Sequence, residues 1–417
     1  MAQTATPPPK ALDQQDARVK VGSGSPRDML TNFGYRVRSG DLGPLPVVVG
    51  LIVIAVVFQA LNSLFLSSGN LVNLIYDSSA VGMIALGIVF VLVLGEIDLS
   101  VGSLSGLSSA LLGVLYVNKG WNPILAILVA ALSGAVIGFA YAQVRNRFGM
   151  PSFVITLAGL LAFLGVQLQL LGSQGSINLP YGSGLVTFGQ QQFLTPILAY
   201  IVAVLAAVAV FVAGILNIRR RRAANLSASS PANVVIRAVA LLVVLLLAAW
   251  YLNRDNGVPW MFAIFVLMIV AANYALTKTN WGRHMFAVGG NEEAARRAGI
   301  NVNMIYTSAF VLTGLFAAVG GVLSAARLAS SSQSAGTGDV NLNAIAAAVI
   351  GGTSLFGGRG SAYSALLGIL VIQSISNGLT LLNLSSAYRY MITGAVLALA
   401  VLIDSLARRS RVQHGTA

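Results

Sequence analysis

Long apolar runs follow one another along most of the chain, separated by short polar breaks. A helix needs about 20 apolar residues to cross a bilayer, and most of these runs approach that length. The runs are continuous, whereas the strands of a membrane barrel alternate between apolar and polar residues. The sequence therefore predicts an all-α polytopic integral membrane protein with about 10–12 transmembrane helices. The expected segments are 45–66, 79–95, 101–117, 123–144, 151–171, 196–216, 234–252, 259–276, 304–326, 343–356, 361–382 and 387–404.

The scarcity of charge supports the same class of protein. Only 9% of the 417 residues are charged and 56% are hydrophobic, whereas about a quarter of the residues in a soluble domain are charged. This composition excludes a soluble enzyme, a disordered protein and a nucleic-acid-binding protein, despite the net charge of +13.

The positive charges indicate how the chain crosses the membrane. If the N-terminus is cytoplasmic and every segment crosses, only Lys119, Arg254, Arg327 and Arg389 fall outside, and the other 21 of the 25 lysines and arginines fall inside. Cytoplasmic loops are enriched in these residues. We therefore expect both termini in the cytoplasm, with the anionic membrane surface as the counterpart of the net charge.

Three regions are predicted along the chain. Residues 1–44 are rich in proline, glycine and mixed charges and are expected to form a disordered cytoplasmic tail without a cleavable signal peptide. Residues 45–405 form the transmembrane domain, and 406–417 form a basic cytoplasmic tail. Segment 343–356 is short and rich in glycine, so it is either re-entrant or buried among other helices.

Several kinds of chemistry are excluded. The chain has no cysteine and only two histidines, which excludes disulfides, thiolate metal sites, a cysteine nucleophile and a histidine metal cluster. Thr277 stands where a phosphate-binding loop before Lys278 and Thr279 would need glycine. We therefore predict no catalytic residue, no cofactor and no metal, and we do not expect the chain itself to hydrolyse ATP.

The loop 277–303 contains a short helix with its own start and stop signals. Asn291 is a good N-cap, and two glutamates followed by two arginines suit the ends of the helix dipole. Gly299 is a good C-terminal stop. A helix of two turns does not persist alone in water, so this one must dock either on its own membrane domain or on a cytoplasmic partner. The capping and charge pattern alone does not decide between these two docking sites.

The same loop resembles a known coupling motif. Glu293-Ala294-Ala295 followed by Gly299 is similar to the loop of ABC-transporter permeases that fits a cleft in the ATPase subunit. The stretches Gly289-Gly290-Asn291, Ala294-Ala295-Arg296 and Ala298-Gly299-Ile300 resemble the sugar permeases of bacterial binding-protein-dependent importers. The Ile-x-Leu-Pro sequence of the wider ABC pattern does not follow Gly299. The resemblance assigns ATPase coupling to Gly289, Gly290, Asn291, Glu292, Glu293, Ala294, Ala295, Arg296, Arg297 and Gly299.

Three further stretches match this family in the expected order. They are 96–103, 151–159 and 344–361, and the resemblance covers roughly residues 45–405. The additional apolar pair 196–216 and 234–252, joined by Arg219–Arg222, resembles the longer xylose-type branch. The resemblance implies a monosaccharide permease of the bacterial inner membrane, with D-xylose as the expected sugar and ribose, arabinose or galactose as alternatives. It also implies a second permease copy, a cytoplasmic ATPase and a periplasmic sugar-binding protein as partners.

Two acids precede the segment at 101. Acids at membrane depth are functional candidates by default, so Glu96 and Asp98 could belong to a gate. The structural alternative is favoured: Asp98 and Ser100 would cap the helix that starts at 101, and Glu96 would pair with an arginine on the inner side, such as Arg359.

Gly351, Gly352, Gly357, Gly358 and Gly360 permit either tight helix packing or a moving gate, and packing is the favoured interpretation. The main rival function is an ion-coupled transporter. It would need a relay of acids near the middle of the bilayer, and besides Glu96 and Asp98 only Asp404 falls within the segments.

Overall fold

The computed structural model describes residues 45–228, 230–388, 390–396, 398, 399 and 402. Most described residues are helical, as the sequence predicts, and one pair of short antiparallel strands is present among them. The chain divides into two compact units. Of the described residues, 194–257 form the smaller unit and all others form the larger unit. The predicted tails 1–44 and 406–417 lie outside the described residues.

The larger unit contains the helices that surround the candidate site. They are α2 (Leu45–Leu61), α3 (Ser68–Val93), α4 (Val101–Gly113, continued by a π-helical turn at Val114–Asn118), α5 (Pro123–Phe148), α6 (Ser152–Leu171, followed by a 3-10 turn at Gly172–Gln174), α7 (Gly184–Gln190), α10 (Trp260–Lys278), α11 (Asn280–Gly290), α12 (Glu292–Arg297), α13 (Val302–Leu328), α14 (Asp339–Ile350) and α15 (Tyr363–Leu381). The strands are β1 (Ser176–Asn178) and β2 (Ser330–Ser332).

Among the described residues, nine helices are long and apolar enough to span a membrane. Two more apolar helices, α2 and α14, are shorter. Of the last expected segment, 387–404, the described residues 387, 388, 390–396, 398, 399 and 402 are helical. The prediction of an all-α polytopic membrane protein is confirmed.

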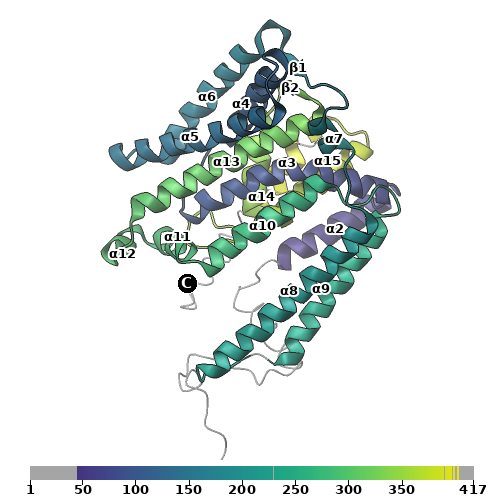
Figure 1. Ribbon diagram of the computed structural model, residues 1–417, viewed down its shortest axis with the longest axis vertical. Helices are drawn as coiled ribbons and strands as arrows, with labels where there is room; N and C mark the ends of the chain where they lie inside the picture. Colours follow the sequence, from purple (N-terminus) through teal and green to yellow (C-terminus); the bar gives the residue numbers. More distant parts are fainter. Residues whose placement is uncertain (1–44, 229, 389, 397, 400–401, 403–417) are drawn as a thin grey trace, which may run out of the picture. The chain divides into compact units, whose positions relative to one another are not determined.

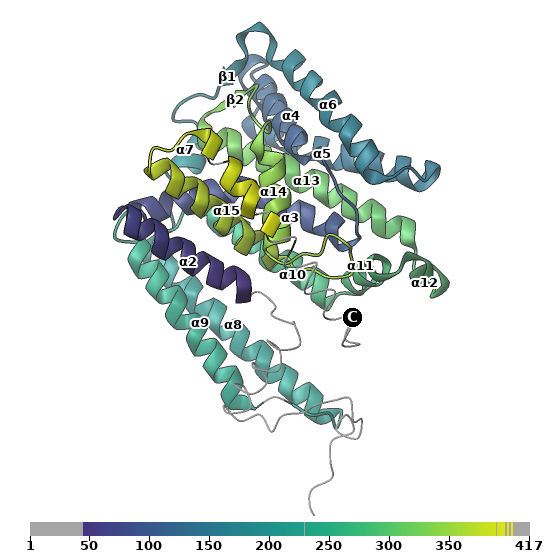
Figure 2. The ribbon, with the colours of Figure 1, turned by 180° about the vertical axis from the view of Figure 1, so that it is seen from behind.

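The core of the larger unit forms around α3 and α13. Helix α13 packs against α5, α3 and α4 (Figure 1). It approaches α5 so closely that a side-chain carbon added at Gly138 would collide with the carbonyl of Phe310. Seen from behind, α14 and α15 pack together, and α2 lies along α15 (Figure 2). Small residues thus let these backbones approach, as is common between membrane helices.

Helix α3 begins earlier than the apolar run at 79 predicts. The additional turns carry Asn70 and Asn73, which interrupt the hydrophobic pattern. Ser67 caps the helix by accepting from the Asn70 amide, and the Asn70 Nδ2 group donates to Asn377 Oδ1 at 2.8 Å. Capping and a partner on α15 therefore extend the helix through polar residues.

Helix α14 accounts for the short segment predicted at 343–356. Its 12 residues give a length of about 18 Å, well below the thickness of about 30 Å of the hydrocarbon layer. Ala344 and Ala346 to Ala348 are buried, and the helix packs against α15 and α3. Of the two possibilities, burial among other helices is what the structure shows.

The smaller unit is a hairpin of two apolar helices, α8 (Pro196–Ala223) and α9 (Pro231–Leu252). Thr195 and Ser230 cap them, each followed by proline at the first helical position. Ala199, Ala203 and Ala207 recur every four residues and are buried, so they lie on one face of α8. Most other side chains of the pair are exposed apolar groups, as expected of helices in contact with lipid.

The hairpin is inserted between neighbouring points of the larger unit. Phe193 and Pro259, which flank it in the sequence, form a β-bridge, and the Trp260 amide donates to the Gln192 carbonyl at 3.1 Å. The backbone of the larger unit therefore closes on itself without residues 194–257.

Candidate functional site

Helix α12 has the local structure that the sequence predicts. Asn291 Oδ1 accepts from the Ala294 amide at 2.9 Å, which caps the helix. Arg296 pairs with Glu292 at 2.8 Å and Arg297 pairs with Glu293 at 3.1 Å, each four residues apart. Gly299 has φ +83°, the left-handed conformation that ends a helix at low cost. Residues 291–299 thus specify both where α12 begins and where it ends.

One face of α12 rests on its own membrane unit. Ala295 is only 4% exposed, whereas Glu293, Ala294, Arg297 and Ala298 are exposed. The resemblance assigns both Ala294 and Ala295 to ATPase coupling, but only Ala294 is exposed on this chain, because neighbouring helical positions point about 100° apart. The helix is docked on its own chain and also presents a free face.

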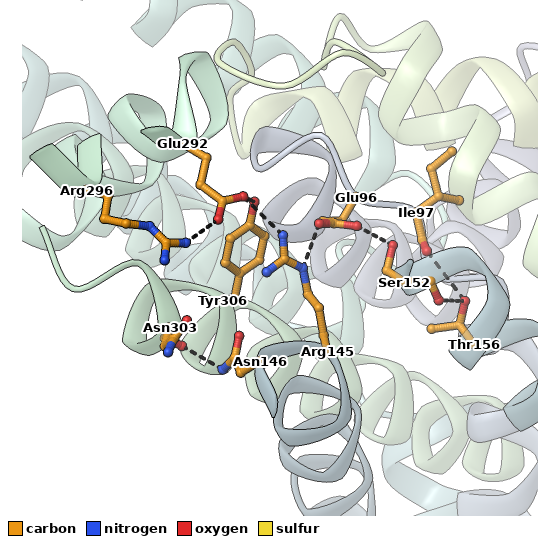
Figure 3. Close-up of polar contacts among 10 residues, drawn as sticks. All are labelled: Glu96, Ile97, Arg145, Asn146, Ser152, Thr156, Glu292, Arg296, Asn303 and Tyr306. Carbon is orange, nitrogen blue, oxygen red and sulfur yellow. Dashed lines mark hydrogen bonds and ion pairs between the residues drawn. The ribbon is translucent and has the colours of Figure 1, made fainter. Parts of the chain in front are cut away.

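Arg145 joins α12 to two other parts of the fold. Its Nε group donates to Glu96 Oε1 at 2.8 Å, and its Nη2 group lies 3.3 Å from Glu292 Oε2. The guanidinium also stacks on the Tyr306 ring, with Cζ 3.2 Å from the ring centroid. Figure 3 shows Arg145 between the two carboxylates. Residues of α5, α12, α13 and the loop 94–100 therefore meet at one side chain.

The expected partner of Glu96 is corrected by this geometry. Glu96 pairs with an arginine as expected, and the partner is Arg145 at the end of α5 rather than Arg359, which was given as an example. The second oxygen of Glu96 accepts from the Ser152 hydroxyl at the start of α6. Thr156, one turn further along α6, accepts from the Leu99 amide at 3.1 Å. The loop 94–100 is thus fixed to α6 as well as to α5 (Figure 3).

Asp98 bonds within this loop and does not cap a helix. It is 1% exposed, and its Oδ1 atom accepts from the Ser100 amide at 2.8 Å and the Ser100 hydroxyl at 2.7 Å. Ser100 occupies the N-cap position of α4 without a side-chain capping bond, and it accepts from the Tyr141 hydroxyl at 2.9 Å. The predicted double cap is replaced by an Asx-type turn, because Asp98 bonds two residues ahead rather than into the helix.

The glycines flanking these elements are mostly packing positions. The Gly358 amide donates to the Val93 carbonyl at 2.8 Å. An added side-chain carbon at Gly289 would collide with the same carbonyl, and one at Gly357 would lie 2.6 Å from the Gly289 carbonyl oxygen. Gly351 packs against the backbone of Ser364 and Gly360 against Thr353, whereas Gly352 and Gly290 have free space. The end of α11 thus packs directly against the loops that follow α3 and α14.

A polar pocket of about 370 Å³ opens beside the ion pairs. Its lining consists of Glu96, Arg145, Asn146, Gly149, Met150, Pro151, Glu292, Arg296 and Asn303. Burial acts to raise the pKa of Glu292, but Arg145, the Tyr306 hydroxyl and Arg296 outweigh it, so the pKa lies below its usual range. Glu292 is therefore ionised at neutral pH, and the site offers ion pairing and a mechanical connection rather than acid–base chemistry.

Sequence reasoning missed several members of this site. Arg145, Ser152 and Tyr306 were not assigned any role there, and residues 280–290 were not expected to be helical. A signal for α11 was present, since Thr279 caps it by accepting from the Gly282 amide at 3.2 Å. No local signal connects Arg145 to Glu96, which is 49 residues away.

Comparison with known proteins identifies the class and then the family. The model for the permease component of branched-chain amino acid transport systems matches residues 70–401. The xylose transport system permease protein of Escherichia coli is 36% identical over 389 residues, which cover 91% of this chain and 96% of that protein. The Haemophilus influenzae protein of that name is 34% identical over 372 residues, 89% of this chain and 98% of the relative.

The ribose import permease protein of Bacillus subtilis is 32% identical over 363 residues, which cover 87% of this chain and 92% of that protein. No solved structure matches. The fold is that of a multi-pass membrane permease. The chain belongs to the family of permease components of branched-chain amino acid transport systems. Within it, the chain is an ABC sugar permease similar to the xylose permeases.

Proposed function

We propose that this chain is the translocation subunit of an ATP-driven importer that carries D-xylose across the bacterial inner membrane. The observation that carries the proposal is α12, a capped helix that is anchored on one face by Ala295 and Glu292 and free on the other. The xylose permeases among the relatives and the inserted hairpin α8–α9 support the choice of sugar. The permease itself performs no bond chemistry.

The proposed mechanism is alternating access driven from the cytoplasmic side. A separate ATPase subunit binds the free face of α12, closes on ATP and displaces the helix. Two permease copies then change the side on which the sugar path is open, and a periplasmic binding protein delivers the sugar. The exposed Ala294 and Ala298 leave room for close contact, and Arg297 offers a charge to an acidic partner surface.

Reconstitution into liposomes tests this function. The permease and its cognate ATPase are placed in the membrane, the binding protein and labelled xylose are added on one side, and ATP is supplied to the ATPase. We expect uptake that requires hydrolysable ATP and persists when ionophores collapse the ion gradients. Uptake that follows the gradient without ATP would instead establish an ion-coupled transporter.

The choice of sugar is tested separately by competition. Unlabelled xylose should suppress uptake at lower concentration than ribose, arabinose or galactose. Stronger suppression by ribose would favour the function named for the ribose permease relatives and would leave the ATP-driven mechanism intact.

A further inference from the structure

Arg145 is placed to act on several elements at once. Its side chain is only 16% exposed and contacts a carboxylate on α12 and another on the loop 94–100. An arginine can do this because its planar guanidinium has five donors arranged as a fork, whereas a lysine ammonium acts as a point charge. The Glu96 carboxylate on this loop also accepts from the hydroxyl of Ser152, the first residue of α6.

We propose that Arg145 is a positioning residue that transmits the displacement of α12 to the loop 94–100 and to the start of α6. This inference rests on the proposed function, in which an ATPase moves α12. It assigns the coupling between the ATPase and the membrane helices to one side chain, rather than to the backbone connection of α12 alone.

The ion pair of Arg145 with Glu96 is shorter and less exposed than its ion pair with Glu292. Glu96 is 16% exposed, lies 2.8 Å from Arg145 and has a second partner in Ser152. Glu292 is 38% exposed and lies 3.3 Å from Arg145. Charge-assisted hydrogen bonds are stronger when short and shielded from water. Arg145 therefore belongs firmly to the loop and α6, and its pair with Glu292 is the point at which α12 engages or releases them.

The surroundings of α12 allow such movement. The pocket beside the ion pairs leaves free volume on one side of Glu292. A side-chain carbon added at Gly299, beyond the last residue of α12, would meet nothing within 4 Å, whereas one at Gly289, in the last turn of α11, would collide with the Val93 carbonyl. The pocket gives the Glu292 side chain room to leave and regain Arg145, while the close packing of Gly289 holds the end of α11 in place.

The test is the number of sugar molecules imported per ATP hydrolysed, measured in the reconstituted complex. Arg145→Lys keeps the charge but cannot hold both carboxylates together. Arg147→Lys is the matched control, because Arg147 lies two residues away on the same helix, is exposed and forms no ion pair within the described part of the chain. Glu292→Gln is the second variant, because it weakens the outer pair and leaves Glu96 bonded to Arg145.

We expect both Arg145→Lys and Glu292→Gln to bind the ATPase and hydrolyse ATP while the number of sugars imported per ATP falls, because the displacement of α12 no longer reaches the loop 94–100. The ratio should not change in Arg147→Lys. An unchanged ratio in Arg145→Lys and Glu292→Gln would overturn the inference, even if the yield of folded protein falls, since that would show a purely structural role. If the wild-type complex imports no sugar with ATP, the proposed function fails instead.

Discussion

At the scale of single residues, Gly289 and Gly290 offer a direct comparison. They are adjacent in the last turn of α11, but a side-chain carbon at Gly289 would collide with the Val93 carbonyl and approach the Gly358 amide, whereas one at Gly290 would meet nothing within 4 Å. Gly289→Ala should therefore destabilise the permease by about 1–3 kcal/mol, the usual cost of overpacking, and lower its apparent Tm in detergent. Gly290→Ala should leave the Tm unchanged, and an equal Tm for both variants would contradict the packing shown here.

Residues also show where prediction from sequence works and where it fails. The cap at Asn291 and the stop at Gly299 were predicted correctly, because each depends on neighbours within four positions. An arginine partner for Glu96 was predicted correctly, but which arginine was not, because the choice of Arg145 depends on how α5 packs beside the loop 94–100. For the same reason, the contacts of Glu292 with Arg145 and Tyr306 were not predicted.

At the scale of elements, the two faces of α12 predict different outcomes for one substitution. Ala294→Asp places a charge on the exposed face, so the permease should fold in normal amount but lose its ATPase during co-purification. Ala295→Asp places the charge at a position that is 4% exposed. An unpaired buried ion costs several kcal/mol, so the yield of folded permease itself should fall.

The measurements are the amount of monodisperse permease and the ATPase retained per permease. If Ala294→Asp kept the ATPase and transported sugar normally, the role of α12 as the coupling helix would have to be abandoned. If Ala295→Asp folded as well as Ala294→Asp, the orientation of the helix shown here would be wrong.

Element boundaries were predicted only where apolar runs define them. Helices α5, α6, α8, α9 and α10 lie close to their expected segments, because a continuous apolar run is itself the requirement for crossing a bilayer. Helix α11 was missed because its glycines weaken the helical signal. The core around α3 and α13 could not be derived either, since it depends on small residues that meet only in the folded chain.

At the scale of the whole molecule, the 21-to-4 division of positive charge predicts which loops face the cytoplasm. The native chain has no cysteine, so a single introduced cysteine gives an unambiguous signal with a maleimide that cannot cross membranes. Three exposed positions suit the test: Tyr181 in the loop before α7, Ala224 in the loop between α8 and α9, and Arg297 in α12.

In spheroplasts, Tyr181→Cys should react at once, because the loop before α7 is expected to face the periplasm. Ala224→Cys and Arg297→Cys should react only after the membrane is permeabilised, since Arg219–Arg222 and the loop 277–303 carry the positive charge of the inner side. Each variant must first support wild-type sugar uptake, so that labelling reports the native arrangement. Reaction of Ala224→Cys in intact spheroplasts would show that the inserted hairpin crosses in the opposite direction, and reaction of Arg297→Cys there would place α12 beyond the reach of any cytoplasmic ATPase.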